Sequence, residues 1–153
     1  GARGGGGGRG RRGGWGWGDG PRRRGADGWT IGLDSGGRIA VDRNERKMWG
    51  RLRAAHAAGE VHVNHAGVLG QVWRGGPRQE RLSRAMQGIE VQPLDDALGR
   101  AAGELLATAG LNDVIDAAVV LLSRDDDEIV TSDRADFERL VAASRRHVEL
   151  IHP

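Results

Sequence analysis

The chain alternates short strand-like runs with longer helix-like segments from Trp29 onward, and this alternation limits its fold more than any other feature. Strands that are separated by helices usually pair in parallel, with the helices packed on the sheet faces. The pattern predicts an α/β fold: one small parallel sheet flanked by helices. The expected strands are 29–33, 60–64, 89–94, the run near Ile129, and 148–151, and the expected helices are 45–58, 68–73, 78–87, 96–109, 113–122 and 136–144.

Composition excludes several classes of protein. With 153 residues, of which 38% are hydrophobic, the chain has enough apolar side chains for one domain with a core. Cysteine is absent, which excludes disulfides, thiolate catalysis and cysteine-ligated zinc. The longest apolar run, 117–122, is too short to cross a bilayer. We therefore expect a soluble cytoplasmic protein without a membrane partner.

The first 28 residues differ from the rest in charge and composition. They hold 14 of the 27 glycines, with seven Arg and two Asp, while the remainder has 16 basic and 19 acidic residues. A segment with so little to bury is expected to be disordered. It is either an Arg-Gly arm that grips RNA, or a linker or upstream sequence with no function, and the second explanation is favoured. The predicted boundaries are a tail at 1–28 and a domain at 29–153.

Acidic residues stand where the predicted elements begin and end. Asp34 follows the first strand, Asp133 follows the run at Ile129, and Asp113 and Asp116 are three apart on one helix. Ligands of open parallel sheets bind at the carboxyl ends of the strands. Carboxylates gathered there repel one another unless a cation neutralises them, and hard oxygen ligands select Mg²⁺ or Mn²⁺. The spacing therefore favours one acidic metal site.

Helix capping is the alternative explanation for two of these acids. Asp113 can cap the helix that holds Asp116, and Asp133 can cap the helix that holds Asp136. For either residue alone, capping is the more common role. Asp34 is harder to explain in this way, because Gly36 and Gly37 follow it and disfavour a firm helix start.

Three motifs together resemble the PIN domain, most closely the VapC-type toxin ribonucleases. They are Ile31-Gly-Leu-Asp34-Ser35, Asn112-Asp113-Val-Ile-Asp116-Ala, and Val130-Thr-Ser-Asp133-Arg-Ala-Asp136-Phe137. The resemblance implies a PIN-like domain that binds Mg²⁺ or Mn²⁺ and hydrolyses RNA. It places Asp34, Asp113 and Asp133 on the family's catalytic, metal-binding acids, and Asp136 on a frequent accessory acid. It also implies a cognate antitoxin protein and a homodimer.

The chain departs from that pattern where family members usually carry a glutamate. Gln71 stands there instead as a candidate accessory residue that supplies no charge, and Asp116 is a candidate replacement as a fourth metal ligand. Arg38 is a second departure, since the family usually has an apolar residue just after the first Asp. The leading hypothesis is a metal-dependent endoribonuclease of toxin type. The alternative is a catalytically impaired PIN-like module that binds RNA or protein.

Basic and aromatic residues of the middle segment allow two interpretations. Arg74 and Arg78 are candidate RNA-phosphate contacts, although a solvated helix face is the more common meaning of such arginines. Trp73 lies at helical spacing and is predicted to belong to the core. His65 lacks further ligands at metal spacing, so a packing or surface role is expected for it.

Overall fold

The computed structural model describes residues 31–34, 39, 46–57, 62–87 and 89–153. The predicted tail at 1–28 and the turn with Arg38 lie outside these ranges. The described elements are β1 (Ile31–Leu33), α2 (Arg46–Ala57), β2 (His62–His65), α3 (Ala66–Val72), the 3₁₀ helix η1 (Pro77–Gln79), α4 (Glu80–Met86), β3 (Ile89–Gln92), α5 (Asp96–Ala109), α6 (Val114–Leu122), β4 (Glu128–Val130), α7 (Arg134–Ser144) and β5 (Glu149–Ile151).

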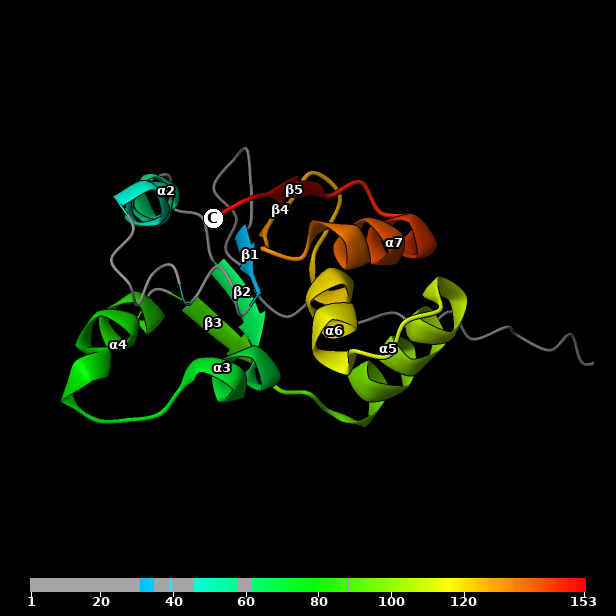
Figure 1. Ribbon diagram of the computed structural model, residues 1–153, viewed down its shortest axis with the longest axis horizontal. Coiled ribbons are helices and arrows are strands. Elements are labelled where there is room, and N and C mark those ends of the chain that lie inside the picture. The colour runs from blue at the N-terminus through cyan, green and yellow to red at the C-terminus, as the bar shows by residue number, and fades with distance from the viewer. Residues whose placement is uncertain (1–30, 35–38, 40–45, 58–61, 88) are drawn as a thin grey trace, which may run out of the picture.

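All of the described strand pairs are parallel, as the alternating pattern predicts. β4 pairs with β1 on one side and with β5 on the other, and β2 pairs with β3. The ladders of the described residues thus form a three-stranded and a two-stranded sheet, which adjoin where β1 contacts β2 (Figure 1). In the register of β1 with β4, Leu33 lies opposite Val130. The residues that follow these two strands therefore emerge side by side at one edge.

Several element boundaries differ from the prediction for identifiable reasons. β3 ends at Gln92 rather than at residue 94, because Pro93 has no N–H to donate to a ladder. The helix expected at 78–87 opens with the 3₁₀ turn η1. α7 begins at Arg134 rather than at residue 136, since Asp133 caps it. The boundaries of α5 agree with the sequence: Asp95 caps its start, and Gly110 ends it in the left-handed conformation that glycine tolerates.

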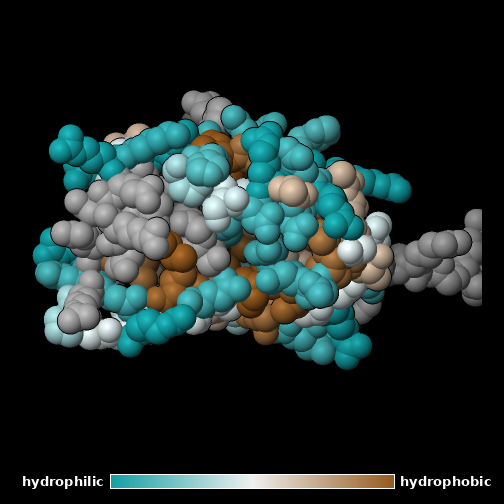
Figure 2. Space-filling model, viewed as in Figure 1, coloured by the Kyte–Doolittle hydropathy of each residue, from teal (hydrophilic) through white to brown (hydrophobic). Residues whose placement is uncertain are grey.

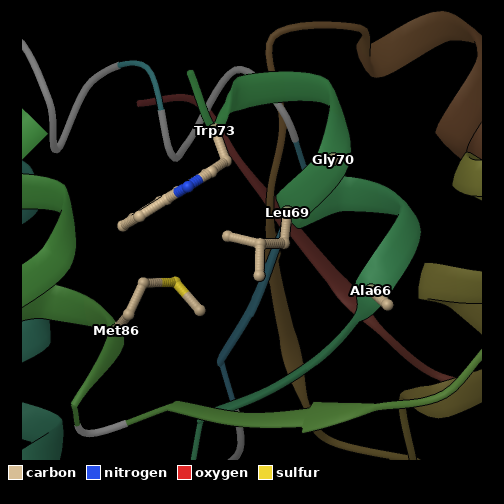
Figure 3. A pocket seen from close by; sticks show the side chains of 5 residues that line it. All are labelled: Ala66, Leu69, Gly70, Trp73 and Met86. Atoms are coloured by element: carbon tan, nitrogen blue, oxygen red, sulfur yellow. The ribbon is translucent and has the colours of Figure 1, made fainter. Parts of the chain in front are cut away.

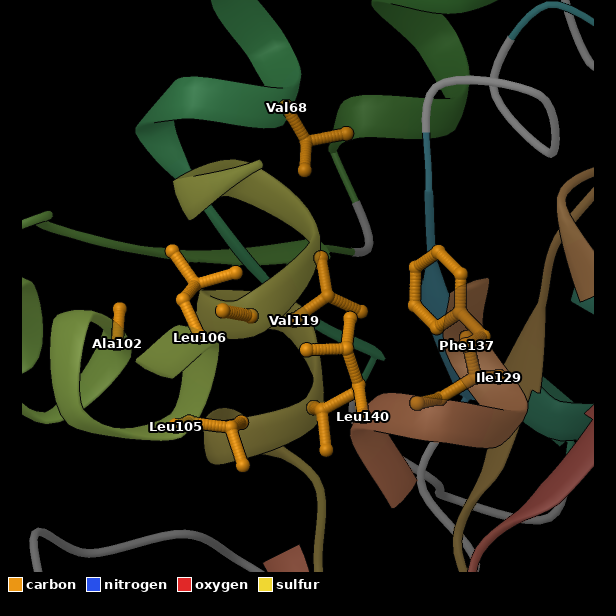
Figure 4. Packing of buried hydrophobic residues seen from close by; sticks show 10 residues of the cluster. Val68, Ala102, Leu105, Leu106, Val119, Ile129, Phe137 and Leu140 are labelled. Atoms are coloured by element: carbon orange, nitrogen blue, oxygen red, sulfur yellow. The ribbon is translucent and has the colours of Figure 1, made fainter. Parts of the chain in front are cut away.

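The main core lies between α5, α6, α7 and β4 (Figure 4). α6 is apolar around most of its circumference and is largely buried. Its first turn, which carries the acidic residues, is thereby fixed against the rest of the domain. The buried cluster consists of Val68, Ala102, Leu105, Leu106, Ala117, Val119, Val120, Ile129, Phe137 and Leu140. Within the described ranges no single helix is long and apolar enough to span a membrane.

The prediction that Trp73 belongs to the core is wrong. Its side chain is 42% exposed, whereas Val68 and Val72 of the same apolar run are buried. α3 ends at Val72, and Trp73 is its C-cap residue with an extended backbone (φ −75°, ψ 125°). The change of backbone conformation takes the indole off the buried stripe of the helix.

Candidate functional site

Asp34 lies buried at the edge where β1 and β4 end. Its side chain is 4% exposed, and its Oδ2 accepts a hydrogen bond of 2.6 Å from the hydroxyl of Thr131. The backbone N–H of Asp34 also donates to the carbonyl of Val130, which continues the pairing of the two strands by one residue. The parallel register therefore places Asp34 beside the loop that leads to Asp133.

Thr131 connects two of the predicted acids. While its hydroxyl donates to Asp34, its Oγ1 accepts a 2.9 Å hydrogen bond from the backbone N–H of Asp133. A hydroxyl can do both at once, because it carries one donor and two acceptor lone pairs. Thr131 is 1% exposed, so both bonds are shielded from water. One side chain thus fixes the position of Asp133 relative to Asp34.

Asp113 and Asp133 both cap helices, as the alternative explanation expected. Oδ1 of Asp113 accepts from the backbone N–H groups of Ile115 (2.8 Å) and Asp116 (3.2 Å) at the start of α6. Oδ1 of Asp133 accepts from the N–H of Asp136 at the start of α7, at 3.4 Å. Capping fixes the orientation of each carboxylate and occupies Oδ1. It is compatible with a second role for Oδ2.

Asp116 shows that the acids lie near one another. Its pKa is raised from 3.8 to about 7, first by burial and then by the negative charges of four other carboxylates. Those four, in decreasing order of effect, are Asp113, Asp34, Asp133 and Asp136. We call these five residues the acidic cluster. Asp136 also lies 3.9 Å from the guanidinium of Arg139, an ion pair on the exposed side of α7.

The acidic cluster has the donor chemistry of a Mg²⁺ or Mn²⁺ site. All five side chains offer carboxylate oxygens. The pKa of Asp116 is raised first by burial and then by repulsion from the other carboxylates, and a divalent cation would relieve that repulsion. The conformation is more open than a metal shell, however. Among the described residues, no group of three or more His, Asp or Glu side chains is close enough to hold one ion. The residues fit a metal by their chemistry, and side-chain movement would have to bring the carboxylates closer together before they could hold one ion.

His65 ties the helix that bears Gln71 to the helix that bears Asp116. The ring is fully buried at the end of β2. Its Nδ1 accepts from the N–H of Gly67 at 3.1 Å and caps α3, so Nε2 carries the proton and donates to the carbonyl of Ile115 at 2.9 Å. A Cβ at Gly67 would collide with the side chain of Ile115, so glycine permits this close approach of α3 to α6. Of the two roles expected for His65, packing or surface, the structure shows the buried one.

The structure places the remaining candidates on or after α3. Gln71 is exposed and lies four residues after Gly67, hence on the side of α3 that faces α6. Arg74 is exposed, and its guanidinium donates to the carbonyls of Gly70, Gln71 and Trp73 at the C-terminal end of α3. The backbone of Arg78 belongs to η1. Its side chain lies outside what the structure describes.

Two residues of the site carried no separate signal in the sequence. Thr131 stands between a strand and an acid, a position compatible with any polar loop residue, and its bond to Asp34 spans 97 residues. His65 is a lone histidine at a strand end, and nothing in the sequence indicates that its side chain is buried. Thr131 could be identified only if the strand register were known. Leu33 pairs with Val130, so the residue after Val130 must lie beside the residue after Leu33.

Comparison with known proteins supports the fold. No family model matches the chain, and no curated protein matches it in sequence. The chain is similar in structure to a chain of the "Crystal structure of VapBC2 from Rickettsia felis bound to a DNA fragment from their promoter". The two share a TM-score of 0.60 at 15% sequence identity, over 79% of this chain and 98% of that one. At this identity the likeness concerns the fold: a small parallel sheet with helices packed around it.

Proposed function

We propose that this chain is a metal-dependent endoribonuclease, the toxin component of a toxin-antitoxin pair, with a PIN-like domain at residues 29–153. The single observation that carries the proposal is the convergence of four carboxylates on the half-buried Asp116, whose pKa is raised to about 7. An acid with a perturbed pKa that lies among other carboxylates beside strand ends is typical of a catalytic site. The fold likeness to a VapBC2 chain adds support for this class.

In the proposed reaction, Asp34, Asp113, Asp116 and Asp133 hold Mg²⁺ or Mn²⁺, with Asp136 as an accessory acid. A bound divalent ion supplies a water of lowered pKa and neutralises charge that develops on the phosphodiester. Thr131 holds Asp34 and the loop of Asp133 in fixed positions. The caps at Asp113 and Asp133 orient their carboxylates before any ligand arrives. No nucleophilic side chain is required.

A catalytically impaired PIN-like module is the second candidate. It is favoured by the neutral Gln71 and by the absence, among the described residues, of a group assembled to bind metal. Such a module would bind RNA or protein without hydrolysis. The partners that we propose for the enzyme are a cognate antitoxin and a second copy of the chain, both in the cytoplasm. An impaired module would have the same two partners.

Incubation of the purified protein with mixed single-stranded RNA tests the proposal. We expect internal cleavage with Mg²⁺ or Mn²⁺ and none with chelator. A thermal melt in the presence of Mn²⁺ separates the two candidates, because a ligand that binds the folded state stabilises it. An enzyme gains stability from Mn²⁺ and cleaves. RNA that stays intact, together with an unchanged melting temperature, would favour the impaired module.

A further inference from the structure

A surface cavity lies between α3 and the end of α4, and none of the five carboxylates of the acidic cluster lines it. It has a volume of about 430 Å³, and its lining is almost entirely apolar. In Figure 3 the indole of Trp73 is seen close to edge-on, with Leu69 and Met86 across the open space from it. The helix side is formed by the small residues Ala66 and Gly70. Such a volume falls within the range of small-ligand pockets.

The segment around the cavity is basic. Residues 73–87 contain four Arg and one Glu, a net charge of +3. The exposed guanidinium of Arg74 is held next to Trp73 by its bonds to the last carbonyls of α3, and Arg84 on α4 pairs with Glu80. Figure 2 shows apolar surface in the lower left, over the region of α3 and α4, with hydrophilic side chains beside it. Positive charge beside an exposed aromatic ring is typical of surfaces that bind single-stranded nucleic acid.

We propose that this cavity is a base-binding subsite, in which one base of single-stranded RNA stacks on Trp73 while the basic segment holds the adjacent phosphates. The inference rests on the proposed function and deepens it by assigning a substrate-binding surface. The five carboxylates repel a phosphate backbone, so the attraction for RNA must come from elsewhere on the molecule. Because the lining offers few polar groups, we expect stacking that tolerates any base.

The position of the cavity suits this role. His65 at the start of α3 is bonded to Ile115 in the first turn of α6, and Trp73 caps the other end of α3. The seven residues of α3 lie between His65 and Trp73, which are therefore about 12 Å apart along the helix axis. α3 therefore connects the base-binding subsite to the acidic cluster. The positive charge of residues 73–87 favours RNA over a protein partner. An apolar protein side chain would fill the cavity without pairing with the arginines, whereas RNA phosphates would pair with them.

Gly70 allows the cavity to be blocked without loss of helix stability. A Cβ added at Gly70 meets no atom within 4 Å, and the same is true of Gly103 on the exposed side of α5. Leucine at either position improves helix propensity. Gly70→Leu places its side chain at the cavity, whereas Gly103→Leu is a matched control on another helix. Trp73→Leu removes the aromatic face and keeps the lining apolar.

The experiment measures the affinity of the full chain for a single-stranded RNA oligonucleotide and for an abasic one of equal length, in chelator and at fixed salt. We expect Gly70→Leu and Trp73→Leu to bind the RNA roughly 5- to 150-fold more weakly. Gly103→Leu should bind like the unchanged chain, and the abasic strand should not distinguish the variants. The tail is present in every variant and contributes equally.

Wild-type affinity in Gly70→Leu and Trp73→Leu would overturn the inference. A change from dimer to monomer in both variants without RNA, with RNA affinity unchanged, would also overturn it and assign the cavity to a protein interface. Because binding is measured in chelator, the result does not depend on catalysis. Cleavage with Mn²⁺ by the unchanged chain is assayed separately, so failure of the proposed function is distinguishable from failure of the subsite.

Discussion

The hydroxyl of Thr131 donates a 2.6 Å hydrogen bond to the carboxylate of Asp34, and this contact joins the ends of β1 and β4 into one site. Both residues are buried, and the same hydroxyl accepts from the N–H of Asp133. The arrangement makes the position of Asp133 depend on Asp34, although almost a hundred residues separate them. Loss of this hydroxyl should therefore affect two acids at once.

Thr131→Val should destabilise the fold by about 1.5–3 kcal/mol, since it removes a buried hydrogen bond to a carboxylate. The rate of RNA cleavage should fall by more than the loss of folded protein explains, because the backbone N–H of Asp133 loses its hydrogen bond to Thr131. Chemical unfolding and RNA cleavage measured side by side give both quantities. Thr131→Ser keeps the hydroxyl and serves as the control. If valine and serine behaved alike, the hydroxyl would have no role in the site.

Asp116 predicts a pH-dependent penalty on stability. Its pKa is raised from 3.8 to about 7 on folding, so the unfolded chain loses this proton first as the pH rises. The contribution of Asp116 is zero at the lowest pH, becomes steadily more destabilising between those two values, and is constant above the higher one. Asp116→Asn removes the penalty.

We expect Asp116→Asn to be more stable than the unchanged chain at pH 8, by about 1–2 kcal/mol after allowance for solvent screening. At pH 3.5 the two should be equally stable. Denaturant unfolding at both pH values checks this, with Glu104→Gln on the exposed side of α5 as the control. Equal stability of Asp116→Asn and the unchanged chain at pH 8 would show that the acidic cluster does not strain the fold.

Gln71→Glu should strengthen metal binding. Gln71 lies on the side of α3 that faces α6, so a carboxylate there adds negative charge near the acidic cluster. The affinity for Mn²⁺ should rise by on the order of tenfold, because charge count tunes such sites. Calorimetric titration of Gln71→Glu and Gln71→Ala with Mn²⁺ measures the effect. Identical affinities would place position 71 outside the metal site.

His65 permits its two hydrogen bonds to be tested separately. Asparagine can replace Nδ1 as the acceptor for Gly67, whereas glutamine can replace Nε2 as the donor to Ile115. We expect His65→Gln to retain more Mn²⁺ affinity than His65→Asn, since only the tie to Ile115 positions α6. His152→Asn is an exposed control. Equal losses in both variants would show that the bond from His65 to Ile115 has no separate effect on Mn²⁺ affinity.

The sequence predicts which acids begin helices or follow strands. It does not predict the long-range contacts that hold those acids in place. Capping signals at Asp95, Asp113 and Asp133 are local, so helix starts could be predicted from single residues and their spacing. The bond from Thr131 to Asp34 depends on strand register, which a single chain does not display. Trp73 shows a further limit: it continues the helical spacing of the apolar residues, yet α3 ends one residue before it.

Cleavage of labelled single-stranded RNA by Asp34→Asn tests the central claim most directly. Asparagine preserves the shape of Asp34 and removes its charge, so the fold should remain intact by circular dichroism. With Mn²⁺, we predict that the unchanged chain and Glu104→Gln cut the RNA internally, and that Asp34→Asn leaves it whole. Cleavage by folded Asp34→Asn at the rate of the unchanged chain would contradict the assignment of the acidic cluster as the active site.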